Sequence, residues 1–342
     1  MLLYQVNYYK RSGADVKNVL MIVNPRAGKN SKRINTGDVV RAFKKNGIDC
    51  FEKTTTCQGD AIEIARKYAS EYDAIACCGG DGTYNEVVNG LMQSGEDKPV
   101  LYLPCGSTND FAASIGIKND PETAVQMFVD GMLHRFDVGR MNDRYFTYIA
   151  AFGVGTDFSY NTSQKFKNMF GHAAYVIDGF ILNIVPILKN LKAYHMTIEY
   201  DEGVVEDDFY FGAIANTNKI AGLFKMDNFD VKMNDGEFEV LLVRKSNVKG
   251  IADVFFSALR QDYSHKDFVF FKTNKLKITS VLPVDWTLDG EYGGAYTEIE
   301  IENFREAVNL VSPESIFLEL FRGRKSVPIF CGVSYVDKTF FL

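Results

Sequence analysis

The sequence has few histidines, no CxxC cysteine pair and no excess of positive charge. Its six cysteines include no CxxC pair, and only four histidines accompany them, so a structural zinc site is not expected. The formal net charge of −6 is unlike that of proteins whose main partner is nucleic acid, because those are usually basic. We therefore expect no nucleic-acid partner. Cys77 and Cys78 sit in an apolar run, so we expect them to be buried free thiols in a reducing cytosol.

Long hydrophobic runs are also missing. The opening stretch MLLYQVNYYKRSG contains no long apolar segment and no cleavage site, so no signal peptide is expected. The most apolar long segment runs from Ala173 to Leu191. It is interrupted by Asp178, Asn183 and Pro186, which argues against a membrane span. These absences predict a cytoplasmic protein whose membrane contact is peripheral, at the inner face.

The first part of the chain alternates short apolar runs with amphipathic stretches. This rhythm of strand and helix indicates a parallel α/β sheet that is covered on both faces. Ligands of such sheets bind at the carboxyl ends of the strands. The expected strands are 19–23, 48–54, 74–78 and 100–103, and the expected helices are 36–46, 60–70 and 84–92.

Beyond about residue 135 the pattern changes to period-2 alternation with polar turns, which predicts an antiparallel sandwich. A chain of 342 residues is expected to form two domains. We assign 1–135 to an α/β domain, with 312–342 as a candidate to complete it, and 136–311 to a β-rich domain. Within the second domain we expect strands in 137–154, a long helix at about 164–191, and strands at 194–200, 209–215, 238–243, 275–281 and 297–301.

The segment Gly79 to Thr83, GGDGT, lies between an expected strand and an expected helix. Glycines permit positive φ and remove side chains that would block a phosphate. Successive N–H groups can then converge on an anion, and the helix that follows points its positive end at the same place. Asp81 has three open roles, which are to cap the helix, to orient the loop or to hold a metal. Taken alone, the loop fits a phosphate site and an empty strand–helix turn equally well.

Two further turns end neighbouring strands in the same way. The first, Asn24 to Lys29, is not a Walker A loop, because Val23 stands where the first glycine would be and Asn30 follows the lysine. The second, Pro104 to Asp110, is PCGSTND. Three strand ends rich in small, hydroxyl and amide residues are expected to line one cleft.

In order and spacing, NPRAG, GGDGTYNEV and PCGSTNDFA resemble the catalytic domain of diacylglycerol kinases. The resemblance is strongest to the soluble bacterial lipid kinases of that superfamily, which also includes sphingosine and ceramide kinases, and it spans about 18–313. GGDGT alone is shared with NAD kinases and, loosely, with phosphofructokinases, whereas PCGSTNDFA narrows the choice to lipid kinases. The resemblance implies an NAD kinase/phosphofructokinase-like α/β domain that binds ATP, followed by a β-rich domain that binds the lipid and a metal.

The resemblance also implies the residues that contact ATP. Thr55 is assigned from its place before Gly59-Asp60-Ala61, and neighbouring Thr54 and Thr56 leave that assignment open by one position. Ser107 stands where many relatives have threonine, and the hydroxyl is kept. The full expected set is Asn24, Pro25, Arg26, Ala27, Gly28, Thr55, Gly79, Gly80, Asp81, Gly82, Thr83, Tyr84, Asn85, Glu86, Ser107, Asn109 and Asp110.

The segment Asp289-Gly290-Glu291 supplies two carboxylates that flank a glycine. On the residues alone it reads as a solvated hairpin turn. The resemblance places the catalytic base here, because a positioned carboxylate can accept the proton of a lipid hydroxyl as the P–O bond forms. We favour Glu291 as the base, with Asp289 as the alternative or as a positioning partner. Asp81 is a third candidate catalytic residue.

The turn Asn234-Asp235-Gly236 also reads as a hairpin on its own. In the bacterial members of the family the matching turn binds a structural magnesium, which is distinct from the Mg²⁺ that accompanies ATP. The resemblance implies that Asp235 supplies a carboxylate, and Lys232 and Glu237 supply main-chain carbonyls. Hard oxygen ligands of this kind suit Mg²⁺.

The whole pattern predicts an ATP- and Mg²⁺-dependent kinase that transfers the γ-phosphoryl group to a lipid alcohol at the membrane surface. Diacylglycerol, giving phosphatidic acid, is the preferred acceptor, and the sequence leaves a homodimer open. One alternative is an NAD kinase-like enzyme with a soluble substrate, against which PCGSTNDFA argues. The other is a non-catalytic nucleotide-binding regulator, against which the presence of both Asp289 and Glu291 argues.

Overall fold

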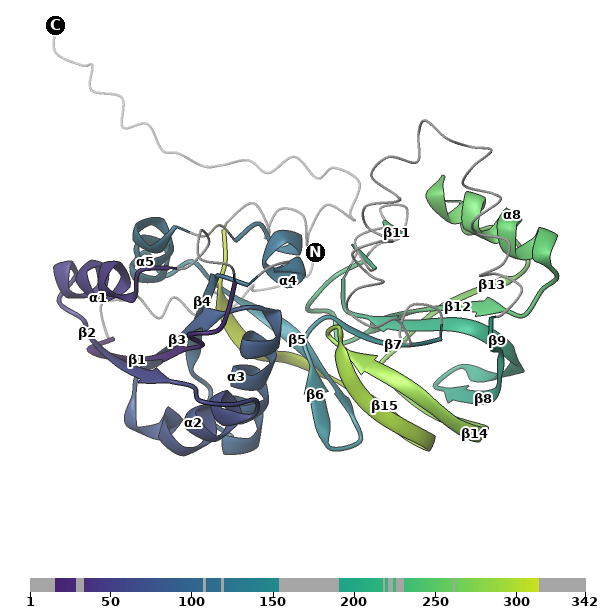
Figure 1. Ribbon diagram of the computed structural model, residues 1–342, viewed down its shortest axis with the longest axis horizontal. Coiled ribbons are helices and arrows are strands. Elements are labelled where there is room, and N and C mark those ends of the chain that lie inside the picture. The colour runs from purple at the N-terminus through teal and green to yellow at the C-terminus, as the bar shows by residue number, and fades with distance from the viewer. Residues whose placement is uncertain are drawn as a thin grey trace, which may run out of the picture.

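The computed structural model describes residues 16–28, 34–106, 109–117, 120–153, 191–217, 219–220, 224–225, 231–260 and 262–313. The expected helix at about 164–191 and the tail beyond 313 lie outside these ranges. Figure 1 shows an α/β half joined to a β-rich half, with β5 and β15 running between them. An α/β domain followed by a β-rich domain is therefore confirmed.

The α/β half is built on four parallel strands in the order β2-β1-β3-β4. β1 (Asn18–Val23), β3 (Ala74–Gly79) and β4 (Pro99–Pro104) are almost entirely buried, as near-continuous apolar runs are in parallel sheets. β2 (Asp49–Thr54) is the edge strand and has no fully buried residue. Each strand lies where the sequence predicts it.

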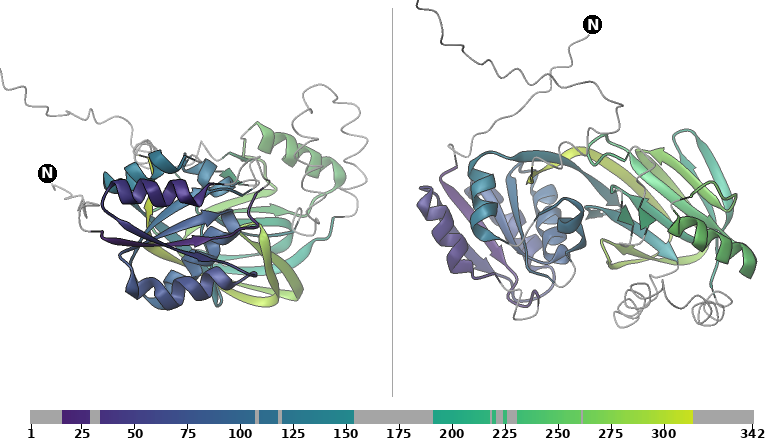
Figure 2. Two further views of the ribbon diagram at one scale, coloured as in Figure 1. Left: turned by 60° about the vertical axis from the view of Figure 1, so that its left-hand side comes forward. Right: turned by 90° about the horizontal axis from the view of Figure 1, so that it is seen from above.

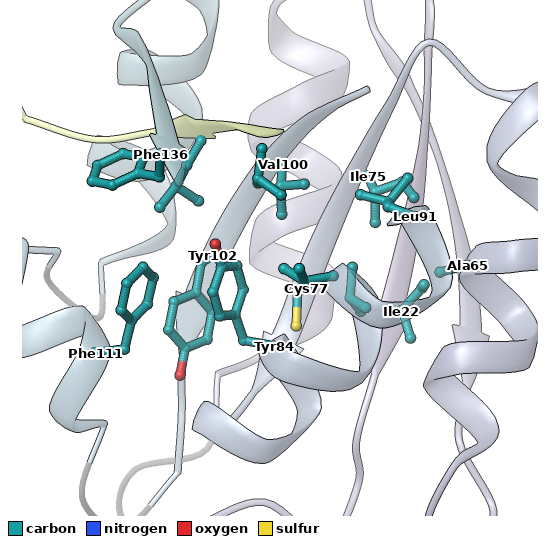
Figure 3. Packing of buried hydrophobic residues seen from close by; sticks show 14 of the residues in the cluster. Ile22, Ala65, Ile75, Cys77, Tyr84, Leu91, Val100, Tyr102, Phe111 and Phe136 are labelled. Carbon is teal, nitrogen blue, oxygen red and sulfur yellow. The ribbon is translucent and has the colours of Figure 1, made fainter. Parts of the chain in front are cut away.

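Helices cover both faces of this sheet (Figure 2). α1 (Thr36–Lys45) and α5 (Pro121–Val129) pack on one face. α2 (Asp60–Tyr68) and α3 (Asp81–Ser94) pack on the other, around the core drawn in Figure 3. None of the helices in the described ranges combines the length and apolar character needed to cross a bilayer. Two short helices complete this half, η3 (Ala69–Glu71) and α4 (Asp110–Ser114).

In the part of the chain that the structure describes, the β-rich half carries antiparallel strands and the helix α8 (Val248–Leu259), which packs on the sheet through Val254 and Ala258. Its strands are β5 (Leu133–Met141), β6 (Arg144–Phe146), β7 (Ile149–Gly153), β8 (Tyr194–Tyr200), β9 (Gly203–Ala215), β10 (Lys219–Ile220), β11 (Phe224–Lys225), β12 (Phe238–Arg244), β13 (Phe268–Thr273), β14 (Lys275–Leu288) and β15 (Glu291–Val311).

These antiparallel strands do not form the two separate sheets of a sandwich. Among the described strands, the order β13-β12-β9-β7-β14-β15 continues through β15 into β4, so one sheet spans both halves. In the β-rich half this sheet encloses a core that contains Phe152, Phe238 and Trp286. The sandwich expectation is therefore wrong in its topology, because strand alternation reports which residues are buried and not which strands pair.

β15 is the strand that connects the halves. Its first residue, Glu291, pairs with Leu288 of β14, and near its other end Leu310 pairs in parallel with Val100 of β4. The α/β sheet is thus extended by the end of β15, directly before the segment 312–342 that the sequence suggests for that role. The turn between β14 and β15 is held against the α/β half by this arrangement.

Candidate active site

The carboxyl ends of the parallel strands are tied together by main-chain hydrogen bonds. Asn24 N–H donates to Cys78 O at 2.9 Å, Thr55 N–H donates to Val23 O at 2.9 Å, and Cys105 N–H donates to Gly79 O at 2.8 Å. Side chains add a further link, since Asn24 Nδ2 donates to Thr83 Oγ1 at 2.9 Å. The three turns predicted to line one cleft are therefore neighbours.

Glycines allow the backbones of two of these turns to touch. A Cβ at Gly106 would lie 2.6 Å from the Cα of Gly80, and a Cβ at Gly79 would overlap the Thr83 side chain. Neither space can hold a side chain without movement of the loop. α3 begins at Asp81, inside GGDGT and three residues before the start expected from the sequence. The loop is thus the first turn of the helix, and its N–H groups lie at the positive end of the helix dipole.

A cavity of about 290 Å³ opens beside this helix start. It is lined by residues from both halves of the molecule, so the hairpin between β14 and β15 closes one side of it. The lining residues that the sequence predicts are Asn24, Arg26, Thr55, Gly82, Thr83, Glu86 and Glu291. Thr56, which the sequence leaves open beside Thr55, also lines the cavity, and Cys57 and Gln58 are the lining residues that the sequence misses.

Glu291 brings a carboxylate directly onto the start of α3. A Cβ at Gly82 would overlap Glu291 Oε1, so the glycine leaves the space that this oxygen occupies. The other oxygen, Oε2, accepts a hydrogen bond from Gln58 Nε2 at 3.2 Å. The side chain is exposed to solvent and lines the cavity. Glu291 is therefore an accessible carboxylate at the positive end of a helix.

Asp289, two residues earlier, has the opposite environment. It is 5% exposed, and its oxygens accept from Thr147 N–H at 2.7 Å and from Tyr148 and Ile149 N–H at 3.0 Å. Thr147 Oγ1 and Asn85 Nδ2 also donate, at 2.7 and 2.8 Å. Burial raises the pKa of Asp289, while the hydrogen bonds from Thr147 and its neighbours oppose that rise. With both oxygens occupied, Asp289 fits a positioning role better than that of a base.

The hairpin turn itself explains how adjacent carboxylates reach different places. Asp289 and Gly290 have φ of 51° and 84°, and Leu288 pairs with Glu291, so the loop has two residues. Two left-handed residues in a two-residue loop suit an Asp-Gly sequence. The hairpin expected from the residues alone is present, but its aspartate is buried and not solvated.

Asn85 and Asn89 on α3 carry this network across to the β-rich half. Besides its bond to Asp289, Asn85 Nδ2 lies 3.1 Å from Tyr145 O. Asn89 forms a reciprocal pair with Tyr145, accepting from its N–H at 3.0 Å and donating to its carbonyl at 2.9 Å. The Asn85 amide, predicted to contact ATP, is thus engaged in joining the two halves.

Glu86 also lines the cavity and holds the loop before α2. Its two oxygens accept from Gly59 N–H at 2.9 Å and Ala61 N–H at 3.2 Å, at the start of α2. Burial raises the pKa of Glu86 despite these bonds, and the charge of Glu291 adds to the rise. Glu86 therefore fixes the β2–α2 loop in which Thr55, a predicted ATP contact, lies.

Two residues of the GGDGT-Tyr segment face away from the cavity. Tyr84 is 1% exposed and its ring stacks between Tyr102 and Phe111, at centroid distances of 4.7 and 4.9 Å (Figure 3). Asp81 Oδ1 accepts from Tyr102 Oη at 3.2 Å and from Phe111 N–H at 3.3 Å. Neither side chain is among the residues that line this cavity.

The PCGSTND turn is described in part. Ser107 and the side chain of Asp110 lie outside the described residues. Asn109 has φ of 53°, donates from Nδ2 to Gly106 O at 3.0 Å, and buries an Oδ1 that has no hydrogen-bond partner among the described residues. This turn packs beside Gly80 through Gly106.

The predicted metal turn lies in a group of carboxylates. Asp235 Oδ1 accepts from Glu237 N–H at 3.2 Å, and Oδ2 is 3.7 Å from Lys272 Nζ. Asp137 Oδ2 accepts from Gly236 N–H at 2.6 Å. Lys272 Nζ also lies 3.0 Å from Oε1 of the fully buried Glu239.

These carboxylates repel one another. Burial, with the charge of Asp235 adding, raises the pKa of Asp137 to about 6 and that of Glu239 to about 8. No three His, Cys, Asp or Glu side chains in the described ranges are grouped as a metal-ligand set. A single carboxylate with main-chain carbonyls remains a donor set that suits Mg²⁺, and a cation beside Asp235 would relieve the repulsion.

The residues that the sequence misses carry no recognisable motif. The sequence offers Thr56 only as an alternative to Thr55. Its N–H and Oγ1 donate hydrogen bonds to Asp60 Oδ2 at 2.7 and 2.5 Å, and these bonds hold the loop. These bonds lower the pKa of Asp60 to about 2. Cys77 and Cys78 are buried, as expected, whereas Cys57 in this loop is exposed.

An α/β half with a phosphate-type loop, and a second half that closes it with a carboxylate, define a two-domain kinase. Residues 18–141 match the family profile of the diacylglycerol kinase catalytic domain. Over 305 residues the chain is 32% identical to a diacylglycerol kinase of Staphylococcus epidermidis, covering 89% of this chain and 94% of the relative. It is also 32% identical over 303 residues to a diacylglycerol kinase of Bacillus subtilis, covering 87% and 97%.

A crystal structure of a diacylglycerol kinase from Bacillus anthracis shares the fold, with a TM-score of 0.65 at 22% identity over 88% of this chain and 99% of that one. The chain belongs to the diacylglycerol kinase family. The resemblance carried by the three turns is thereby confirmed, and the alternatives of an NAD kinase and a non-catalytic regulator are not favoured.

Proposed function

We propose that this protein transfers the γ-phosphoryl group of ATP to the hydroxyl of diacylglycerol, giving phosphatidic acid. The observation that carries the proposal is the contact of Glu291 with the start of α3 at Gly82. An accessible carboxylate beside a phosphate-type helix start is where a base is needed for transfer to an alcohol. A soluble regulator would have no use for that carboxylate.

The α/β half supplies the nucleotide side of the proposed reaction. ATP supplies the phosphoryl group, and Asn24, Arg26, Thr55 and Thr83 line the cavity in which its phosphates fit. N–H groups at the start of α3 stabilise negative charge on the transferring group. We assign the remaining residues of the three turns to shaping this site, with Tyr84 acting through its packing in the core.

The second half supplies the base. Glu291 holds the proton taken from the lipid hydroxyl, as the hydroxyl oxygen attacks the phosphorus in line. Asp289 fixes the turn that presents Glu291, because its bonds to Thr147 and Asn85 tie the hairpin to both halves. Asp81 orients the helix start through Tyr102 and Phe111. Enclosure by the two halves would also limit the transfer of phosphate to water.

Mg²⁺ is proposed at two places. One ion accompanies ATP and neutralises its phosphate charge. A second, structural ion is proposed at the Asp235 turn, held by that carboxylate and by the carbonyls of Lys232 and Glu237. The raised pKa values of Asp137 and Glu239 support this position, because a cation there would favour the ionised forms of these grouped carboxylates.

Finer features of the fold belong to the same proposal. We assign an NAD kinase-like topology to the α/β half and place the domain boundary near residue 135. The end of β15 returns to the first domain. Contact with a membrane surface is proposed to be peripheral, because the acceptor is a lipid. A homodimer stays open.

The test is a radiolabelled-ATP assay against a panel of lipid alcohols in mixed micelles, with NAD as a soluble acceptor. Wild-type protein is expected to label diacylglycerol. Glu291→Gln is expected to lower kcat by about 10²- to 10⁴-fold, the usual contribution of general base catalysis. Glu298→Gln, an exposed residue of the same strand that pairs with Lys277, is the matched control. Tight ATP binding without labelling of any lipid would refute the proposal.

A further inference from the structure

One hydrogen bond joins the two halves of the molecule at the cavity, between side chains 233 positions apart. Gln58 Nε2 of the β2–α2 loop donates to Glu291 Oε2 of the β14–β15 hairpin at 3.2 Å. Both residues line the cavity. The sequence motifs assign no role to Gln58, which lies one position before the Gly59-Asp60-Ala61 segment.

The loop that carries Gln58 is fixed on both sides. Before it, Asp60 Oδ2 accepts from Thr56 N–H at 2.7 Å and from Cys57 N–H at 3.3 Å. After it, Gly59 N–H donates to Glu86 Oε1 at 2.9 Å. Gln58 thus projects from a backbone that is anchored at neighbouring residues, which is the arrangement expected where a side chain must hold a set direction.

The chemistry of the contact suits orientation better than neutralisation. An amide donates a hydrogen bond without adding charge, so the carboxylate stays available to take up a proton. The amide engages Oε2, while Oε1 is the oxygen that lies at Gly82 and the start of α3. A lysine in the same place would pair with Glu291 as an ion and oppose its protonation.

We propose that Gln58 is a positioning residue for Glu291, holding its Oε1 toward the site where the acceptor hydroxyl is deprotonated. The inference rests on the proposed function of Glu291 as the base. Gln58 acts on the transfer step and leaves the binding of ATP unchanged. The lost hydrogen bond predicts a three- to ten-fold lower kcat, about the net effect of one solvent-exposed side-chain hydrogen bond.

The test compares Gln58→Met, which keeps the length but removes the donor, with Gln58→Asn, which keeps the amide but shortens it. Both are expected to lower kcat for the lipid with little change in the KM for ATP or in Tm. Gln126→Met is the matched control, because Gln126 is exposed on α5 and bonds Asp130 there. The control is expected to match wild type.

A double-mutant cycle separates positioning from other roles. In the Glu291→Gln background, Gln58→Met is expected to have no further effect on the residual rate. An equal fall in both backgrounds, or a raised Kd for ATP with kcat unchanged, would overturn the proposal and make Gln58 a nucleotide contact or a structural residue. If wild-type protein labels no lipid alcohol, the proposed function is refuted, and the positioning role of Gln58, which depends on it, is refuted as well.

Discussion

The Glu291 carboxylate occupies the space that a side chain at Gly82 would fill. The two residues come from different halves of the molecule, and they meet at the start of α3. The third glycine of GGDGT therefore has a role besides leaving room for a phosphate. The absence of a side chain at Gly82 leaves the space that the Glu291 carboxylate occupies.

Gly82→Ala tests this relationship. The added methyl group would displace Glu291 from the helix start, so we expect kcat for the lipid to fall by about ten-fold or more. A weaker helix would not explain the fall in kcat, because Gly82 lies inside α3 and alanine is the better helix former. Gly37→Ala in the first turn of α1 is the control, where the nearest atom is Asn35 Oδ1 at 3.2 Å. Unchanged kcat in Gly82→Ala would contradict the proposed contact.

Asp289→Asn is expected to destabilise the fold as well as to abolish activity. The new amide would direct N–H groups at donors such as Thr147 N–H and Asn85 Nδ2, leaving buried groups unpaired. We expect a loss of about 3 kcal/mol in the free energy of unfolding, measured by denaturant titration. Asp285→Asn, in β14 (Lys275–Leu288), serves as comparison, because its carboxylate accepts a hydrogen bond from the exposed Tyr292 Oη at 3.2 Å. Equal stabilities of the two variants would exclude a positioning role for Asp289.

The buried Glu239 makes stability depend on pH. Its pKa is raised from 4.5 to about 8, chiefly by burial, so the folded protein keeps a proton that the unfolded chain has lost. The free energy of unfolding therefore falls as pH rises from about 4.5 to about 8. Glu239→Gln removes the titrating group, so its stability relative to wild type should rise as pH increases over that range.

Urea titrations of wild type and Glu239→Gln at pH 5 and pH 8 measure the effect. Asp137, whose pKa is raised to about 6, contributes in the same direction in both proteins and cancels in the comparison. Glu298→Gln, with its exposed partner Lys277, should parallel wild type. A pH-independent difference between Glu239→Gln and wild type would contradict the assignment.

The Asp235 turn predicts a stabilising effect of Mg²⁺. Wild-type protein should show a higher Tm in millimolar MgCl₂ than in EDTA, because an ion that binds only the folded state stabilises it. Asp235→Asn should lose most of that increase, since a neutral amide replaces the carboxylate ligand. Asp201→Asn, on the β8–β9 turn, is a control that should keep it. An unchanged Mg²⁺ response in Asp235→Asn would rule out the turn as a metal site.

Local sequence patterns were sufficient for the strands and most helices of the first half. β1, β3 and β4 are apolar runs that end in glycine or proline turns, and such runs are buried wherever a parallel sheet forms. They were not sufficient for β-strand pairing, since all the described strands of the second half except β10 and β11 join the same sheet as the first half. α5 and α8 also have no counterpart among the expected elements.

The sequence by itself predicted that three turns meet at one edge of a parallel sheet, because each turn follows the carboxyl end of a strand and those ends share one edge of such a sheet. Only the tertiary structure decided that Asp289 is buried while Glu291 is free, and that Gln58 reaches Glu291. Those outcomes depend on contacts across more than two hundred positions, where nothing in the local pattern specifies which side chains will meet.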